Sequence, residues 1–191
     1  ELMRGWACHP GSMMAGLDST FSGVIYIGYH APAGSDGSPL AHTSEYEQIR
    51  WAKVNGKLAS EFTMNSLYAA SLGVPSLFLS GDEAICRMAE EELPGLATVE
   101  VKRCKGNSTW NIHPKTAEKA IEETVARQLA AGAPPVPKVP ETLVLDLCLP
   151  THQAVRSARQ LPGVELVSSE VVRYTAKTVK ELKIACELIT G

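Results

Sequence analysis

The sequence predicts an α/β protein with a mostly parallel sheet flanked by helices, followed by a smaller carboxyl-terminal α/β lobe. Apolar segments of strand length alternate along the chain with segments that have a helical pattern, an order typical of parallel sheets. A proline-rich stretch over residues 132–141 separates the two parts, because repeated proline favours an extended connector. We therefore expect a main α/β portion over 1–131 and a lobe over 142–191.

The first predicted strand is the apolar run over residues 24–29, which is typical of a strand buried on both faces. A loop rich in Gly, Pro and Ser follows over 31–40, and we expect it to be mobile unless other residues organise it. Asn55-Gly56 favours a tight turn, which predicts a hairpin over 49–59. Ser60 is a suitable N-cap for a helix that reaches about residue 72.

The rest of the chain continues the alternation of strands and helices. Pro114 and the alanine-rich segment behind it are typical of a helix with proline in its first turn. The further predicted strands cover 74–80, 97–102, 143–149, 164–167 and 171–174, and the further predicted helices cover 82–93, 114–131, 151–161 and 176–190.

The composition is that of a globular protein, with 45% hydrophobic and 20% charged residues among 191. The net charge of −3 and the scattered Lys and Arg residues argue against nucleic acid or a membrane surface as a partner. Neither a membrane-spanning run nor a signal-peptide pattern is present, so we expect a cytoplasmic location. The cysteines are odd in number and widely spaced, which favours free thiols.

Three residues on neighbouring segments form the candidate site. His30 follows the first strand, His42 closes the loop behind it, and Glu61 begins the next helix. Loops at the carboxyl ends of strands are where open α/β sheets bind ligands, and imidazole and carboxylate groups are good metal ligands. Each residue also has an ordinary structural interpretation: either histidine can be a packing residue, and Glu61 can stabilise the helix start.

Other residues leave alternatives open. Cys86 with a histidine would make a nucleophile–base pair, but its place within a helix between apolar residues is typical of an inert thiol. Asp82 follows a strand and is either a helix N-cap or a residue that orients a ligand from behind. For His113 the simpler interpretation is a helix-capping or packing role. For His9 it is a structural role.

Two motifs of this chain resemble those of the D-aminopeptidase family, the DppA-like dinuclear zinc metallopeptidases. They are Gly28-Tyr29-His30-Ala31 and Glu61-x-x-x-Asn65, and together they are fairly specific. The resemblance runs in order along the whole chain. Further matching segments lie at 16–21, 23–31, 42–44, 56–65, 73–75, 81–82 and 89–94.

The resemblance implies that His30 and Glu61 are zinc ligands, that His42 is the catalytic histidine and that Asn65 supports a ligand or faces the substrate. It implies two zinc ions, water as the nucleophile, short peptides with amino-terminal D-residues as substrates, and a ring-like homo-oligomer. Bound zinc lowers the pKa of water to about 7. His42 would transfer a proton or stabilise the developing oxyanion.

One departure from the family pattern matters for the site. In that family an amino-terminal Asp-x-Glu motif and a further histidine supply the remaining zinc ligands, and nothing before His30 matches them. The resemblance therefore implies that this chain corresponds to the carboxyl-terminal portion of a family member. Its main part, over 1–131, would lack the amino-terminal segment and some of the zinc ligands. We predict a metallo-aminopeptidase, a hydrolase that needs this missing segment as a partner; the alternative is a non-catalytic binding or assembly module.

Overall fold

Sheet A contains the predicted parallel strands. The computed structural model describes residues 2–5 and 7–191. Strand order in this sheet is β1-β4-β5-β6, with β1 parallel to β4, β4 parallel to β5, and β6 antiparallel to β5. These strands are β1 (Val24–Tyr29), β4 (Ser76–Asp82), β5 (Ala97–Lys105) and β6 (Ser108–Asn111). The predicted α/β class with a mostly parallel sheet is confirmed.

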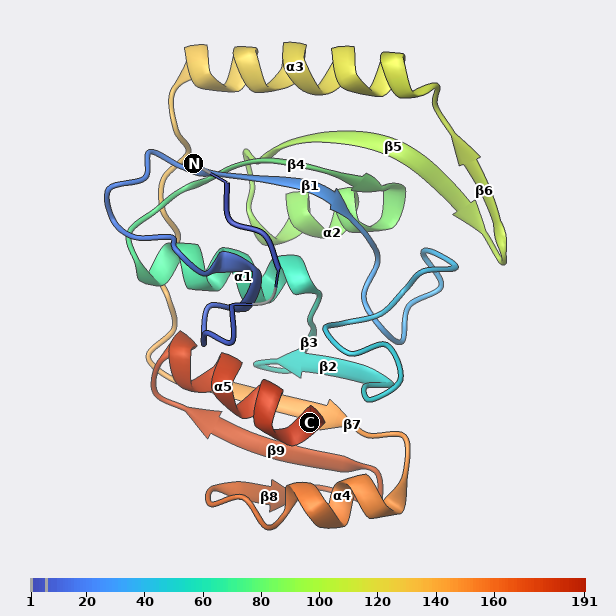
Figure 1. Cartoon of the computed structure of the whole chain (residues 1–191), viewed down its shortest axis with the longest axis vertical. Helices are drawn as coiled ribbons and strands as arrows, with labels where there is room; N and C mark the ends of the chain where they lie inside the picture. Colours follow the sequence, from blue (N-terminus) through green and yellow to red (C-terminus); the bar gives the residue numbers. More distant parts are fainter. Residues whose placement is uncertain (1, 6) are drawn as a thin grey trace.

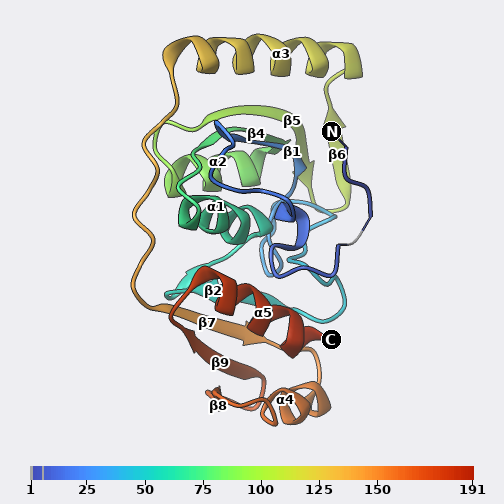
Figure 2. The same cartoon turned by 60° about the vertical axis from the view of Figure 1, so that its left-hand side comes forward.

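Helices lie on both faces of sheet A (Figures 1 and 2). The connecting helices α1 (Glu61–Ser71) and α2 (Glu83–Glu92) lie on one face, and α3 (Pro114–Ala131) crosses the other. Right-handed crossovers between parallel strands place successive helices on one face when the strand order advances in one direction. Because β1 and β4 are parallel, their carboxyl ends reach the same edge of the sheet.

Sheet B is antiparallel and combines strands from two distant parts of the chain. Its order is β3-β2-β7-β9-β8. Its strands are β2 (Trp51–Val54), β3 (Lys57–Leu58), β7 (Leu143–Cys148), β8 (Val164–Leu166) and β9 (Val171–Ala176), and its helices are α4 (His152–Ala158) and α5 (Val179–Thr190). The predicted hairpin is present, with positive φ at Asn55 and Gly56.

The hairpin of β2 and β3 pairs with β7 beyond the proline-rich stretch, because Trp51 lies opposite Cys148 and Val54 opposite Leu145. The sheet of the carboxyl-terminal lobe thus includes two strands from the first part of the chain. The boundaries at 131, 132–141 and 142 stay a prediction, and the hairpin belongs with the second sheet.

Buried apolar side chains form one continuous cluster that spans both sheets. Helix α5 links them, since it packs on β7 and β9 and also contacts α1. Leu182 on α5, Leu145 on β7 and Phe62 on α1 are all fully buried. This shared core fixes α5 against the helix that begins at Glu61.

The burial predicted for the first strand is wrong on one face. Tyr26 is 2% exposed, whereas Ile25 and Ile27 are 43% and 57% exposed. Successive side chains of a strand point to opposite faces, and α1 covers only the face that carries Tyr26. Helix α3, on the other face, packs over β4 and β5, and the two isoleucines of β1 stay exposed.

Strand β6 and the start of α5 are two further departures from the predictions. Strand β6 was not predicted; it returns from β5 through a turn with positive φ at Gly106. Helix α5 begins at Val179, because β9 continues to Ala176 and the Thr178 side chain caps the helix by accepting from the Glu181 N–H. Pairing with β7 thus takes precedence over the helical pattern at residue 176.

Gly81 is required where β4 passes β1. A Cβ added there would stand against the carbonyl oxygen of Tyr29 and 2.6 Å from Cγ2 of Ile85. We expect Gly81→Ala to destabilise the protein by about 1–3 kcal/mol, the usual cost of overpacking, and to move His30 with the end of β1. Chemical denaturation measures this change, and an unchanged unfolding midpoint would contradict the expected clash.

Candidate metal centre

His30 lies directly after β1, at the carboxyl edge of sheet A. The buried carboxylate of Asp82, at the end of β4, fixes this point, since its Oδ2 accepts a hydrogen bond of 2.8 Å from the Ala31 N–H. Its Oδ1 accepts from the Ile85 N–H and caps α2. Asp82 is therefore an N-cap, and its second carboxylate oxygen holds the backbone directly after His30. The carbonyl oxygen of Ala31 lies 3.1 Å from Nδ1 of His30.

His42 is held in a loop that Thr43 anchors to the core. The buried hydroxyl of Thr43 donates to the carbonyl of Ala59 and accepts from the Ala33 N–H, which organises the glycine- and proline-rich loop. Nδ1 of His42 lies 2.7 Å from the carbonyl oxygen of Leu40. The imidazole therefore has a fixed orientation, with Nε2 directed away from its own loop.

Glu61 is the first residue of α1, and a capping box defines that helix start. The side chain of Ser60 accepts from the Thr63 N–H, and Oγ1 of Thr63 accepts from the Ser60 N–H. Oε1 of Glu61 accepts a hydrogen bond of 3.0 Å from the Ser44 N–H, which ties the helix to the loop that carries His42. The predicted helix start is confirmed.

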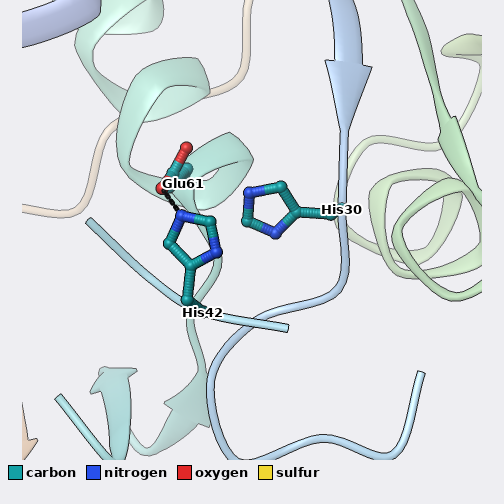
Figure 3. Close-up of side chains that lie close together, drawn as sticks. All are labelled: His30, His42 and Glu61. Atoms are coloured by element: carbon teal, nitrogen blue, oxygen red, sulfur yellow. Dashed lines mark ion pairs between the residues drawn. The ribbon is translucent and has the colours of Figure 1, made fainter. Parts of the chain in front are cut away.

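The three side chains converge (Figure 3). One ligand atom from each of His30, His42 and Glu61 lies within 4.8 Å of the others. The two imidazole rings stack with their centroids 4.1 Å apart, and Nε2 of His42 lies 3.5 Å from Oε1 of Glu61. The side chains of His42 and Glu61 are 28% and 14% exposed, so the site is shielded from solvent but accessible.

The hydrogen bonds assign the ring protons. A carbonyl oxygen can only accept, so Nδ1 of both His30 and His42 carries the hydrogen that it donates to Ala31 and Leu40. In the neutral imidazoles Nε2 then keeps its lone pair. A histidine that donates one ring N–H to a backbone carbonyl and offers the other nitrogen is the usual arrangement for metal binding. With the carboxylate of Glu61, these atoms fit a zinc-type cation.

Aromatic packing sets the spacing between the two sides of this site. The rings of Tyr26 and Tyr29 on β1 each meet Phe62 on α1 edge to face, with centroids 5.1 and 6.4 Å apart. Phe62 follows Glu61 in sequence, and Tyr29 precedes His30. The packing of β1 against α1 therefore determines how closely Glu61 and His30 approach.

Asn65 lies one turn after Glu61 and is almost fully buried. Its Nδ2 donates to Oη of Tyr29 over 2.9 Å, and its Oδ1 accepts from Nζ of Lys183 over 2.7 Å. Lys183 was not among the candidate residues predicted from the sequence. The available signal was its position on α5 among the residues of the buried stripe, which otherwise carry apolar or small side chains.

A cavity of about 360 Å³ lies beside the candidate metal centre, between the amino-terminal segment, α1 and α5. His42 and Glu61 form part of its wall, together with Asn65 and Lys183. The loop over 31–40 contributes none of the described wall residues. The cavity gives a small molecule access to the side chains of His42 and Glu61.

The other candidate residues have structural roles. Cys86 is buried, and burial raises the pKa of its thiol to about 12, which keeps it protonated and unreactive. Nδ1 of His113 accepts from the Lys115 N–H and caps α3. Nδ1 of His9 accepts from the Gly11 N–H within its own turn.

Glu92 is expected to make stability depend on pH near the start of α1. Its Oε1 accepts from Oγ1 of Thr63 over 2.7 Å, and burial raises the pKa of its carboxyl group to about 7. The folded protein then binds more protons than the unfolded chain between pH about 4.5 and 7, so stability falls as the pH rises through this window. Glu92→Gln should be more stable than wild type at pH 8.

The expected gain of Glu92→Gln at pH 8 is about 1–3 kcal/mol, and it should fade below pH about 4.5, where the wild-type carboxyl group is protonated in both states. Urea unfolding across this pH range measures the difference. Glu91→Gln is the matched control, because the Glu91 side chain is exposed. An equal gain at all pH values would contradict the assigned cause.

An α/β sheet whose carboxyl edge gathers two imidazoles and a carboxylate has the type of site that metalloenzymes carry. The family described as D-aminopeptidase matches residues 1–187 of the chain, and the chain belongs to this family. It is 29% identical over 184 residues to a D-aminopeptidase of Bacillus subtilis (strain 168), covering 95% of this chain and 66% of the relative. The chain thus spans just under two thirds of that relative's length.

A solved structure agrees with the fold. It is described as "Zn-dependent D-aminopeptidase DppA from Bacillus subtilis, a self-compartmentalizing protease". The TM-score is 0.89 at 27% sequence identity, with 100% of this chain and 69% of that chain covered. The family resemblance seen in the sequence is confirmed.

Proposed function

We propose that this chain carries part of the active site of a zinc-dependent aminopeptidase that removes amino-terminal residues, mainly D-amino acids, from short peptides. The single observation that carries the proposal is the convergence of His30, His42 and Glu61 within 4.8 Å at the carboxyl edge of sheet A. Family membership supports the reaction class, and the zinc dependence printed for the solved relative supports the metal.

His30 and Glu61 are the proposed zinc ligands. The lone pair on Nε2 of His30 and the carboxylate of Glu61 point into one small region, and both have partners that fix their orientation. Zinc supplies a Lewis acid that polarises a peptide carbonyl and lowers the pKa of water. A catalytic zinc usually has three protein ligands. We therefore propose that residues outside the cluster of His30, His42 and Glu61 supply the remaining ligands, and that the complete site holds two zinc ions.

His42 is the proposed catalytic histidine. Its Nδ1–H is tied to Leu40, so Nε2 is the atom that accepts a proton from the attacking water and returns it to the leaving amine. Oε1 of Glu61 lies 3.5 Å from this nitrogen and stabilises the imidazolium that forms. Asn65, through its contacts with Tyr29 and Lys183, supports the wall that faces the substrate.

The setting of the enzyme is also part of the proposal. The relative described as self-compartmentalizing supports a ring-like homo-oligomer, which would restrict access to short peptides. A cytoplasmic location suits the unpaired cysteines. Within the part of the chain that the structure describes, no helix has the length and apolar character needed to cross a bilayer.

Hydrolysis of matched D- and L-alanyl p-nitroanilides by the protein as its gene encodes it tests the proposal. We expect the protein to release p-nitroaniline faster from the D-isomer than from the L-isomer. This activity should be lost on dialysis against a chelator and restored when zinc is added. Zinc-independent hydrolysis would contradict the assigned chemistry. Failure to hydrolyse either compound, or D- and L-alanyl-glycine, would favour the binding or assembly module instead.

A further inference from the structure

Lys183 is a buried cation in the wall of the cavity beside the candidate metal centre. It is 9% exposed, and its ammonium group lies over the ring of Tyr68 at 5.7 Å from the ring centroid. One of its N–H groups donates to Oδ1 of Asn65 over 2.7 Å. An ammonium has three such donors, so Lys183 has hydrogens to offer in addition to this bond.

The charge of Lys183 lacks a close counter-ion among residues 2–5 and 7–191. None of the ion pairs there, defined by an N–O distance of up to 4.0 Å, includes its Nζ. Burial lowers the pKa of Lys183 to about 8, and the nearby Cys186, Glu61 and Glu187 oppose that shift. A buried ammonium without a close partner is costly, and an anion that reached it would relieve that cost.

The distance to the proposed reaction centre suits a short peptide. Asn65, which holds Lys183, lies four residues after Glu61 on α1, so Glu61 and Asn65 are ~6 Å apart along the helix axis. An extended peptide spans about 3.3–3.6 Å per residue. One or two residues beyond the scissile bond therefore reach from the level of Glu61 to that of Asn65, whose Oδ1 accepts from Nζ of Lys183.

We propose that Nζ of Lys183 binds the carboxyl-terminal carboxylate of a di- or tripeptide whose scissile bond lies beside His42 and Glu61. This inference rests on the proposed function. The other charged groups of the cavity wall, Glu45, Glu61 and Glu187, are acidic and would repel a carboxylate. Lys183 is thus the group in this wall that selects a free acid, and the acidic residues favour the positively charged amino end.

A comparison of D-alanyl-glycine with D-alanyl-glycinamide tests the inference in the wild-type protein. Charge-assisted hydrogen bonds contribute about 1.5–3 kcal/mol, so we expect kcat/KM to be about 10- to 100-fold higher for the acid. Equal kcat/KM values for the two peptides overturn the inference and leave the aminopeptidase proposal standing. Hydrolysis of neither peptide contradicts the proposed function instead.

Lys183→Met keeps the length and apolar stem of the side chain and removes its charge. We expect the ratio of the two kcat/KM values to fall close to one. Lys180→Met on the exposed face of α5 is the matched control and should keep the wild-type ratio. A Lys183→Met protein that folds and retains the preference for the acid overturns the inference.

Binding of uncleavable analogues gives a readout that does not need hydrolysis. Analogues of the two peptides in which a CH2–NH group replaces the scissile amide can be titrated by calorimetry. We expect the acid to bind about 10- to 100-fold more tightly than the amide to the wild type, with this difference lost in Lys183→Met. Equal affinities of the wild type for both analogues would overturn the inference even if no peptide were cleaved.

Discussion

His30→Ala and Glu61→Ala are each expected to reduce bound zinc to trace levels and to lower kcat/KM by on the order of 10³-fold. The physical reason is that each substitution removes one donor from a site whose three described groups lie within 4.8 Å. Metal catalysis contributes several kcal/mol to transition-state stabilisation, and each 1.36 kcal/mol corresponds to about tenfold in rate. Atomic emission of the purified protein and hydrolysis of D-alanyl p-nitroanilide measure the two effects.

His113→Ala and Glu91→Ala are the matched controls for these two substitutions. Each removes the same type of side chain at a position outside the cluster, and both controls should retain zinc and activity. A normal zinc content in both His30→Ala and Glu61→Ala would show that the metal is held elsewhere.

His42→Ala is expected to keep its zinc and to lose about 10²–10⁴-fold in kcat, the usual contribution of general acid–base catalysis. KM should change little, because His42 acts on the proton that moves during the reaction. The profile of kcat against pH should also lose one limb. Nε2 of His42 lies close enough to Oε1 of Glu61 to serve either as a base or as a metal ligand. The substitution distinguishes these two roles.

Zinc content decides the role of His42. Loss of zinc from His42→Ala would make this residue a third ligand and would contradict its assignment as the catalytic base. His152→Ala, in the exposed first turn of α4, is the control for a histidine outside the site. It should leave both zinc content and kcat unchanged.

The sequence alone pointed to the three residues of the candidate site, because His30 and Glu61 stand at element ends with a local signal and His42 closes the loop between them. His30 follows an apolar strand, and Glu61 follows the capping residue Ser60. Asn55-Gly56 likewise predicted the hairpin. Capping and turn preferences act over a few neighbouring residues, so they can be recognised without knowledge of the fold.

Only the tertiary structure decided which distant segments meet. The pairing of β2 with β7 joins residues nearly a hundred positions apart, and no local pattern specifies such a partner. The same holds for the contact between Lys183 and Asn65, which links α5 to α1, and for the exposed Ile25 on an apolar strand. Local preferences determined where the helices and strands form, and the residue types determined which side chains can bind a metal. Burial and long-range packing determined which of these elements and side chains face one another.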